Sequence, residues 1–294
     1  MHTWLITNPN SGSGERNAEF WSSHLRQAGF EQWTDCDLND TAWVDRVSPG
    51  DLVLVAGGDG SVNLAAALAL ETGAILGVLP SGTANDFARH LNLPDDPAEL
   101  CQLMARAPVQ RVDVGRLNQT LYLNVAHIGL GTWPTQDADS QSKRWLGRFS
   151  YGVSLLRRLG VHRGFHADIE GENTSLRGRW LSIAIANGIF YGGGNQIPES
   201  AIDDGYLDIV AVRPRSRLRL IATFFAVGLL RLPIKKQSTV VHLKSRWCRI
   251  QPHQRKLVTA DGEKACDTPV DIQCEAGALQ VVSPGLWRPP SRQS

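Results

Sequence analysis

Five consecutive residues, Gly57-Gly58-Asp59-Gly60-Ser61, have the composition of a turn that binds a phosphate group. The three glycines permit positive φ angles and let backbone N–H groups approach an anion closely. The N-terminus of the helix expected to follow adds a favourable dipole. A carboxylate in such a turn repels phosphate, so Asp59 is better explained as a ligand of Mg²⁺, directly or through water. A tight glycine turn without a ligand is the alternative, and this turn alone does not decide between the two.

A second polar turn, Pro80-Ser81-Gly82-Thr83-Ala84-Asn85-Asp86, follows the next apolar run. Gly82 allows a close backbone approach and Thr83 offers a hydroxyl to a phosphate, although Thr83 or Asn85 could instead cap the helix expected over residues 85–91. Two such turns after neighbouring strands are hard to explain as turns alone. The chain has no G-x-x-x-x-G-K-[ST] sequence, which excludes a P-loop enzyme. It also has no G-x-G-x-x-G that opens a helix, which leaves a dinucleotide-binding Rossmann site unsupported.

Three further segments carry polar groups at turns. Residues 8–12 could wrap nucleotide phosphates through backbone and side-chain groups. Residues 261–263, Asp-Gly-Glu, form either a solvated surface turn or the site of a general base that accepts a proton from a hydroxyl. Residues 201–206 form either a surface turn or a cation site made of one carboxylate and backbone carbonyls.

The elements that must position these turns change character near residue 120. The first part alternates apolar runs with helical patterns, which predicts an open parallel α/β sheet with ligands at the carboxyl ends of its strands. We expect strands over residues 4–7, 51–56 and 74–79, and helices around 20–25, over 63–70 and over 85–91. Each polar turn of this part follows a strand, so one edge of the sheet should collect them.

The second part has many short β-rich segments between turn residues, which predicts a β-sandwich or a barrel. The segments are 121–125, 165–169, 180–185, 207–212, 239–243, 248–250, 270–272 and 278–282. Two helical segments interrupt them, near residues 143–159 and 218–230. We therefore predict a nucleotide-binding α/β domain over residues 1–120, a β-sandwich domain over 121–288 and a tail over 289–294. Two domains suit a chain of 294 residues.

Charge and composition restrict the partners and the compartment. Residues 1–120 contain 7 Lys and Arg against 15 Asp and Glu, whereas residues 121–294 contain 23 against 14. A basic second domain could face anionic lipid or nucleic acid, but the chain has no nucleic-acid readout motif, so we expect no nucleic-acid partner. The five cysteines have no C-x-x-C pair, which is typical of structural thiols in a reducing compartment. With no secretory signal and no apolar run long enough to span a bilayer, we expect a cytoplasmic protein.

Six collinear segments together resemble the diacylglycerol kinase catalytic-domain family, in particular its small soluble bacterial lipid kinases; sphingosine and ceramide kinases are similar relatives. The segments are Asn8-Pro9-x-Ser11-Gly12, Gly57-Gly58-Asp59-Gly60-Ser61, Pro80 to Arg89, Asn187-Gly188 with Gly192-Gly193-Gly194, Asp204 to Asp208, and Asp261-Gly262-Glu263. Each segment is modest alone, and their common order makes the set specific. The resemblance implies a Rossmann-like, NAD-kinase-like α/β domain, a C-terminal β-sandwich, and ATP in the cleft between them.

The resemblance also implies roles for individual residues. The ATP contacts would be Asn8, Pro9, Asn10, Ser11, Gly12, Thr34, Gly58, Asp59, Gly60, Ser61, Val62, Asn63, Leu64 and Thr83. Asp59 would also belong to the catalytic Mg²⁺ network, Glu263 would accept the proton and Asp261 would support Glu263.

A second, structural Mg²⁺ would be held by the Asp204 side chain and the carbonyls of Ala201 and Tyr206. Two positions depart from the residues common in the family. Ser61 replaces a Thr and keeps the hydroxyl, whereas Leu64 replaces a Glu and loses a carboxylate.

The implied function is transfer of the γ-phosphate of ATP to a lipid hydroxyl, such as that of diacylglycerol, in phospholipid metabolism. The apolar residues 218–232 with basic flanks predict transient peripheral contact with a membrane, and packing of the same helix on the sandwich is the alternative. Two other functions stay open: a kinase of a soluble acceptor such as NAD, and a nucleotide-binding lipid sensor without turnover, which the loss at Leu64 would suit. A homodimer is also left open.

Overall fold

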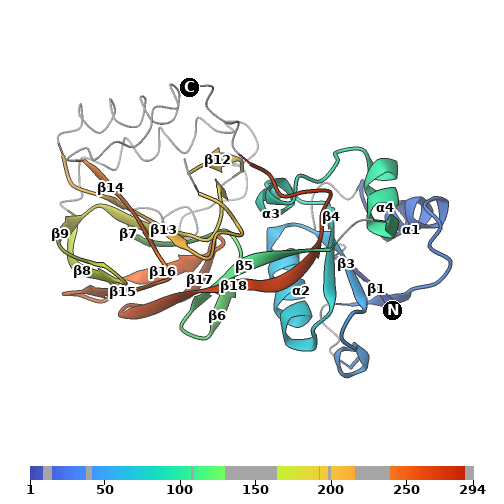
Figure 1. The fold of residues 1–294 in the computed structure, drawn as a ribbon, viewed down its shortest axis with the longest axis horizontal. Helices are drawn as coiled ribbons and strands as arrows, with labels where there is room; N and C mark the ends of the chain where they lie inside the picture. The colour runs from blue at the N-terminus through green and yellow to red at the C-terminus, as the bar shows by residue number, and fades with distance from the viewer. Residues whose placement is uncertain are drawn as a thin grey trace.

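The computed structural model describes residues 1–8, 15–37, 42–106, 109–129, 164–191, 193–197, 200–215 and 239–288. Figure 1 shows a helix-covered parallel sheet beside a β-sandwich, with long strands running between these parts. The helices predicted near residues 143–159 and 218–230, and the tail over 289–294, lie outside the described residues. Within the described part of the chain, no helix is long and apolar enough to cross a membrane.

The first part is a parallel sheet with helices on both faces. Its strand order is β2 (Thr34–Cys36), β1 (Thr3–Thr7), β3 (Leu52–Gly57) and β4 (Ile75–Pro80). The helices are α1 (Ala18–Gln27), α2 (Asp59–Thr72), α3 (Asp86–His90) and α4 (Pro97–Arg106), with a 3-10 helix at Val44–Arg46. All three predicted strands and all three predicted helices are present in this part.

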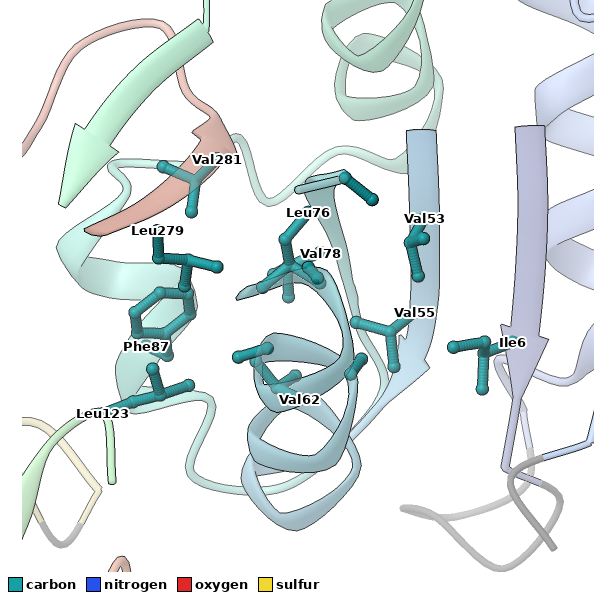
Figure 2. Close-up of a cluster of buried hydrophobic side chains, with 14 of the residues drawn as sticks. Ile6, Val53, Val55, Val62, Leu76, Val78, Phe87, Leu123, Leu279 and Val281 are labelled. Carbon is teal, nitrogen blue, oxygen red and sulfur yellow. The ribbon is translucent and has the colours of Figure 1, made fainter. Parts of the chain in front are cut away.

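Alternation along β3 separates two hydrophobic cores. Val53 and Val55 belong to a core with Val62 of α2, and Figure 2 shows this cluster of side chains in close-up. Leu52 and Leu54 belong to the opposite core, which includes residues of α1 and α4. Because helices cover both faces, every residue of β3 is buried, as expected for a strand in a parallel sheet.

The strand β18 (Val270–Val282) connects the two parts. It pairs in parallel with β4 at Val281 and Leu76, and antiparallel with β5 (Val109–Leu117) and β15 (Trp247–Pro252). We predicted two strands, over 270–272 and 278–282, and the structure has one. A register shift between Glu275 and Leu279 breaks the apolar alternation that the prediction used.

The second part is a sandwich of two mainly antiparallel layers. One layer continues the first sheet through β18, β15, β8 (Phe165–Gly171) and β9 (Thr174–Trp180), with β5 and β6 (Thr120–Tyr122) alongside. The other has the order β14 (Val240–Ser245), β13 (Leu207–Val212), β10 (Ser182–Ala186), β7 (Val125–Gly129), β16 (Leu257–Ala260) and β17 (Glu263–Asp267). A short hairpin pairs β11 (Phe190–Tyr191) with β12 (Asn195–Gln196). The predicted class, an α/β domain followed by a β-sandwich, is confirmed; the boundary at residue 120 stays a prediction.

The predicted strand over 121–125 is two strands in the structure. β6 ends at Tyr122 and β7 begins at Val125. The chain bends at Leu123 and Asn124 because their N–H groups donate to a side chain, the carboxylate of Asp261, and not to a neighbouring strand.

Candidate active site

The two glycine turns touch at the carboxyl ends of β3 and β4. The N–H of Ser81 donates to the carbonyl of Gly57 at 3.0 Å. A methyl group at Gly82 would lie 2.5 Å from the Cα of Gly58, so the two backbones meet where no side chain fits. The sheet order thus places the two polar turns side by side, as the sequence predicts.

The helix α2 begins earlier than its apolar pattern suggested, at Asp59, so Asp59, Gly60 and Ser61 form its first turn. Gly58 is the N-cap residue and brings no side chain to the end of the helix. The first N–H groups of a helix have no intrahelical partner, and with the helix dipole they favour an anion at this position. This end of α2 can therefore hold a phosphate group.

Asn8 joins the end of β1 to this helix end. Its N–H donates to the carbonyl of Ala56 at 3.1 Å, and its Nδ2 donates to Oγ of Ser61 at 2.8 Å. A cavity of about 300 Å³ opens beside Asn8 and is lined also by Arg16 and Glu19. The predicted ATP contacts Pro9, Asn10, Ser11 and Gly12 lie outside the described residues.

Asp59 is a carboxylate that is costly to ionise without a cation nearby. One of its oxygens accepts a hydrogen bond from the N–H of Phe87 at 3.3 Å. Burial raises the pKa of Asp59 to about 6, and the negative charges of Asp86 and Asp261 add to the rise. A divalent cation beside Asp59 would offset these effects. Among the described residues, no group of three or more His, Cys, Asp or Glu side chains is placed to hold a metal ion, so Asp59 would be one ligand and phosphate oxygens or water the others.

Glu263 comes from the sandwich and reaches the first turn of α2. A methyl group at Gly60 would lie 3.5 Å from Oε1 of Glu263, so the carboxylate lies against the helix end. Glu263 is the first residue of β17 and is exposed. Among the described residues, none makes a hydrogen bond or ion pair with this carboxylate, which leaves it able to accept a proton from a substrate.

Asp261 holds the two parts together. Its carboxylate accepts hydrogen bonds from the N–H groups of Leu123, Asn124 and Val125 at 2.7, 2.9 and 2.9 Å, and from Nδ2 of Asn63 at 2.7 Å. Burial raises the pKa of Asp261, and these four donors oppose the rise. With its oxygens occupied, Asp261 is placed to fix the turn that carries Glu263, which suits the predicted supporting role.

The remaining predicted ATP contacts differ in what they present. Thr83 is exposed beside Gly82, and Asn85 folds the turn by accepting from the N–H of Gly82 at 3.1 Å. Val62 is buried in the core, so only its backbone can meet a nucleotide. Leu64 is 61% exposed and offers no polar group.

Among the predicted contacts that the structure describes, Thr34 is the one that lies apart from the others. It is the first residue of β2 and pairs with Trp4, at the opposite end of the sheet from the glycine turns. Its hydroxyl hydrogen-bonds Nε2 of His2 at 2.8 Å. At about 3.3 Å per residue in a parallel strand, the four steps along the chain from Trp4 to Asn8 span about 13 Å.

Two residues near the site were missed as individual contributors. Asp86 is buried and accepts hydrogen bonds from the N–H groups of Gly193 and Gly194 at 2.8 and 2.7 Å. Consecutive glycines with positive φ, here 87° and 93°, aim their N–H groups at one anion, and that pattern was the available signal. His90 is the last residue of α3 and is buried, and burial lowers its pKa to about 3.

The predicted structural cation site does not fit a divalent ion as the side chains stand. Oδ1 of Asp204 accepts from the N–H of Tyr206 at 3.0 Å, and Oδ2 lies 2.5 Å from Nζ of Lys244. The ammonium group therefore occupies the carboxylate oxygen that a cation would need.

Comparison with known proteins agrees with this arrangement. Residues 2–117 match the family model "Diacylglycerol kinase catalytic domain", and residues 126–283 match "YegS C-terminal NAD kinase beta sandwich-like domain". A protein named "Probable lipid kinase YegS-like" from Xanthomonas euvesicatoria is 33% identical over 277 residues, covering 89% of each chain. One of the same name from Chromohalobacter salexigens is 31% identical over 292 residues, covering 96% of this chain and 93% of that one.

Solved structures have a similar fold over nearly the whole chain. A crystal structure from Bacillus anthracis has a TM-score of 0.79 at 25% identity and covers 96% of this chain and 95% of that chain. A second structure from the same organism, described as a diacylglycerol kinase, has a TM-score of 0.73 at 23% identity and shows the shared fold. The chain therefore belongs to the lipid kinase family that joins a diacylglycerol kinase catalytic domain to a YegS-type β-sandwich.

Proposed function

We propose that this protein transfers the γ-phosphate of ATP to a lipid hydroxyl, such as that of diacylglycerol. The observation that carries the proposal is the position of Glu263 against Gly60, at the first turn of α2. A carboxylate able to accept a proton thereby lies at a helix end suited to phosphate, beside the raised-pKa carboxylate of Asp59.

The reaction needs positioning and charge neutralisation more than covalent help from the protein. The lipid oxygen attacks the γ-phosphorus as the bond from that phosphorus to the β–γ bridging oxygen breaks, and ADP leaves. The hydroxyl proton passes to Glu263. The N–H groups that begin α2 and the hydroxyl of Thr83 hold the phosphate oxygens in this proposal, and Asn8 anchors the β1 end against Ser61.

A Mg²⁺ ion held near Asp59 would supply positive charge to the phosphate oxygens. Asp59 suits this role because burial and two neighbouring carboxylates leave its ionised form in need of a cation. The carboxylate of Asp261 keeps the Glu263 turn against the sheet edge through its four hydrogen bonds.

The acceptor class is supported by the name of the relatives, "Probable lipid kinase YegS-like". A lipid hydroxyl must be reached at a membrane surface, so the proposal includes transient peripheral contact by a protein of the cytoplasm. The basic charge of the second part, 23 Lys and Arg against 14 Asp and Glu over residues 121–294, suits an anionic bilayer.

The test is transfer of radioactive γ-phosphate from ATP, with Mg²⁺, into a panel of acceptors. The lipids are presented in mixed micelles: diacylglycerol, phosphatidylglycerol, a sphingoid base and a long-chain alcohol. NAD is included as a soluble acceptor. Label in a lipid supports the proposal, whereas label only in NAD identifies a soluble acceptor. No transfer in a protein that still binds ATP identifies a sensor without turnover.

A further inference from the structure

The turn over residues 201–206 lies in a group of carboxylates whose charges need compensation. Asp113, Asp203, Asp204 and Asp208 all come from this turn or from strands beside it. Burial raises the pKa of Asp113, and the charges of Asp204 and Asp203 raise it further. Such a group attracts a cation, and the question is which cation this chain uses.

Two of these four carboxylates, Asp203 and Asp113, have a partner supplied by the chain itself. Arg288 donates to Asp203 through its guanidinium, with Nη1 at 2.6 Å from Oδ1. Asp113 accepts from the N–H groups of Gly205 and Gly277 at 2.6 and 2.7 Å. Only Asp204 and Asp208 then remain to be compensated.

Lys244 lies between these two carboxylates. Its Nζ is 2.5 Å from Oδ2 of Asp204 and 3.8 Å from Oδ2 of Asp208. Asp208 is fully buried, and its Oδ2 has no hydrogen-bond partner among the described residues, so the ammonium is its nearest cation on that side. His242 holds the other oxygen of Asp208 at 2.5 Å.

Sheet register fixes the position of this lysine. Lys244 on β14 stands directly opposite Asp208 on β13. His242 precedes Lys244 by two residues and therefore lies on the same face of the sheet. The pairing of β14 with β13 therefore places the ammonium group of Lys244 beside these carboxylates.

We infer that Lys244 takes the place of a structural divalent cation in this protein. The ammonium neutralises Asp204 and Asp208 and fixes the turn that ends at Tyr206. A Mg²⁺ ion needs close oxygen ligands in a nearly octahedral arrangement, and here it would have to displace Lys244 from Asp204. The fold then needs no metal at this position, whatever ion serves the glycine turns. This inference does not depend on the proposed catalytic function.

The test is thermal unfolding of the full chain without nucleotide, in EDTA and in millimolar Mg²⁺. We expect any rise in the wild-type Tm on adding Mg²⁺, such as one from an ion beside Asp59, to be the same in Asp204→Asn. Lys244→Met keeps the alkyl chain and removes the charge, so Asp208 loses a cation in a buried site. Its Tm in EDTA should fall by about 4 °C or more, and Mg²⁺ should restore at least about half of that loss. Lys264→Met, at an exposed lysine, serves as the matched control.

The part of the Mg²⁺ response that Lys244→Met shows beyond the wild-type response should disappear when Asp204→Asn is added. The inference is overturned if Mg²⁺ stabilises the wild type and this gain is lost in Asp204→Asn alone, because the ion then displaces the lysine. A folded Lys244→Met protein whose Tm ignores Mg²⁺ overturns it as well. If Lys244→Met does not fold, the comparison of wild type with Asp204→Asn still decides.

Discussion

Nδ2 of Asn63 donates a hydrogen bond to Oδ2 of Asp261 at 2.7 Å, although the two residues are 198 positions apart. Asn63 belongs to the helix that begins at the glycine turn, and Asp261 precedes Glu263 by two residues. This bond, with the three N–H groups of residues 123–125 on the same carboxylate, holds the two parts of the site in register.

Asp261→Asn should destabilise the protein by about 2–4 kcal/mol, because an amide nitrogen would face donors that now meet a carboxylate. Chemical denaturation followed by circular dichroism measures the change. Asp267→Asn, at an exposed carboxylate of the same hairpin, should shift stability by less than about 0.5 kcal/mol. Equal denaturation midpoints for Asp261→Asn and the wild type would show that the four hydrogen bonds to the Asp261 carboxylate do not stabilise the fold.

Asp86→Asn should cost about 1–3 kcal/mol, because one of the N–H groups of Gly193 and Gly194 would lose its acceptor. It should also lower the rate of phosphoryl transfer, since the turn that contains Gly193 and Gly194 would no longer be fixed against α3. The control is Asp95→Asn, at an exposed position. Unchanged stability and unchanged transfer in Asp86→Asn would show that the two bonds contribute nothing.

Asp59 gives a pH dependence with a definite sign. Its pKa is about 6 in the folded protein against an ordinary value of 3.8, so the folded state keeps a proton that the unfolded chain loses between these values. Stability therefore falls as pH rises from about 4 to about 6, by about 1–3 kcal/mol in the absence of Mg²⁺.

Asp59→Asn removes this titration, so its stability relative to the wild type should increase between about pH 4.5 and pH 7. Urea unfolding of both proteins at the two pH values measures the difference, without nucleotide or metal. A difference that stays the same at both values would mean that the carboxylate is not strained in the folded state.

His90 and Gly188 should show strong coupling. A methyl group at Gly188 would lie 2.5 Å from Cε1 of the buried His90 ring. Gly188→Ala should therefore cost about 1–3 kcal/mol in the wild type and much less in a His90→Ala background. A double-mutant cycle measures the coupling, and additive effects would show that the ring can move aside.

The sequence predicts the α/β part well because its signals are local. Buried strands read as continuous apolar runs, and the glycine turns follow them directly, so the shared edge of the sheet and the meeting of Gly58 with Gly82 could be foreseen. The start of α2 could not, because glycine and aspartate are poor helix formers and mark a turn equally well.

The features that the sequence did not predict depend on partners that are far apart along the chain. The acceptor for the N–H groups of residues 123–125 lies 136 to 138 positions away, and no local pattern announces it. Thr34 was grouped with the ATP contacts by resemblance, yet the pairing of β2 with β1 places it at the far end of the sheet. Lys244 reaches Asp204 only through the pairing of β13 with β14.

The central claim is that Glu263 accepts the proton of the attacking lipid hydroxyl. The most direct measurement compares the rate of phosphate transfer to the best lipid acceptor for the wild type, Glu263→Gln and Lys264→Gln, with ATP binding measured for each. The account predicts that Glu263→Gln folds, binds ATP and loses about 100-fold or more in turnover, while Lys264→Gln stays near the wild type. A Glu263→Gln protein with ordinary turnover would contradict it.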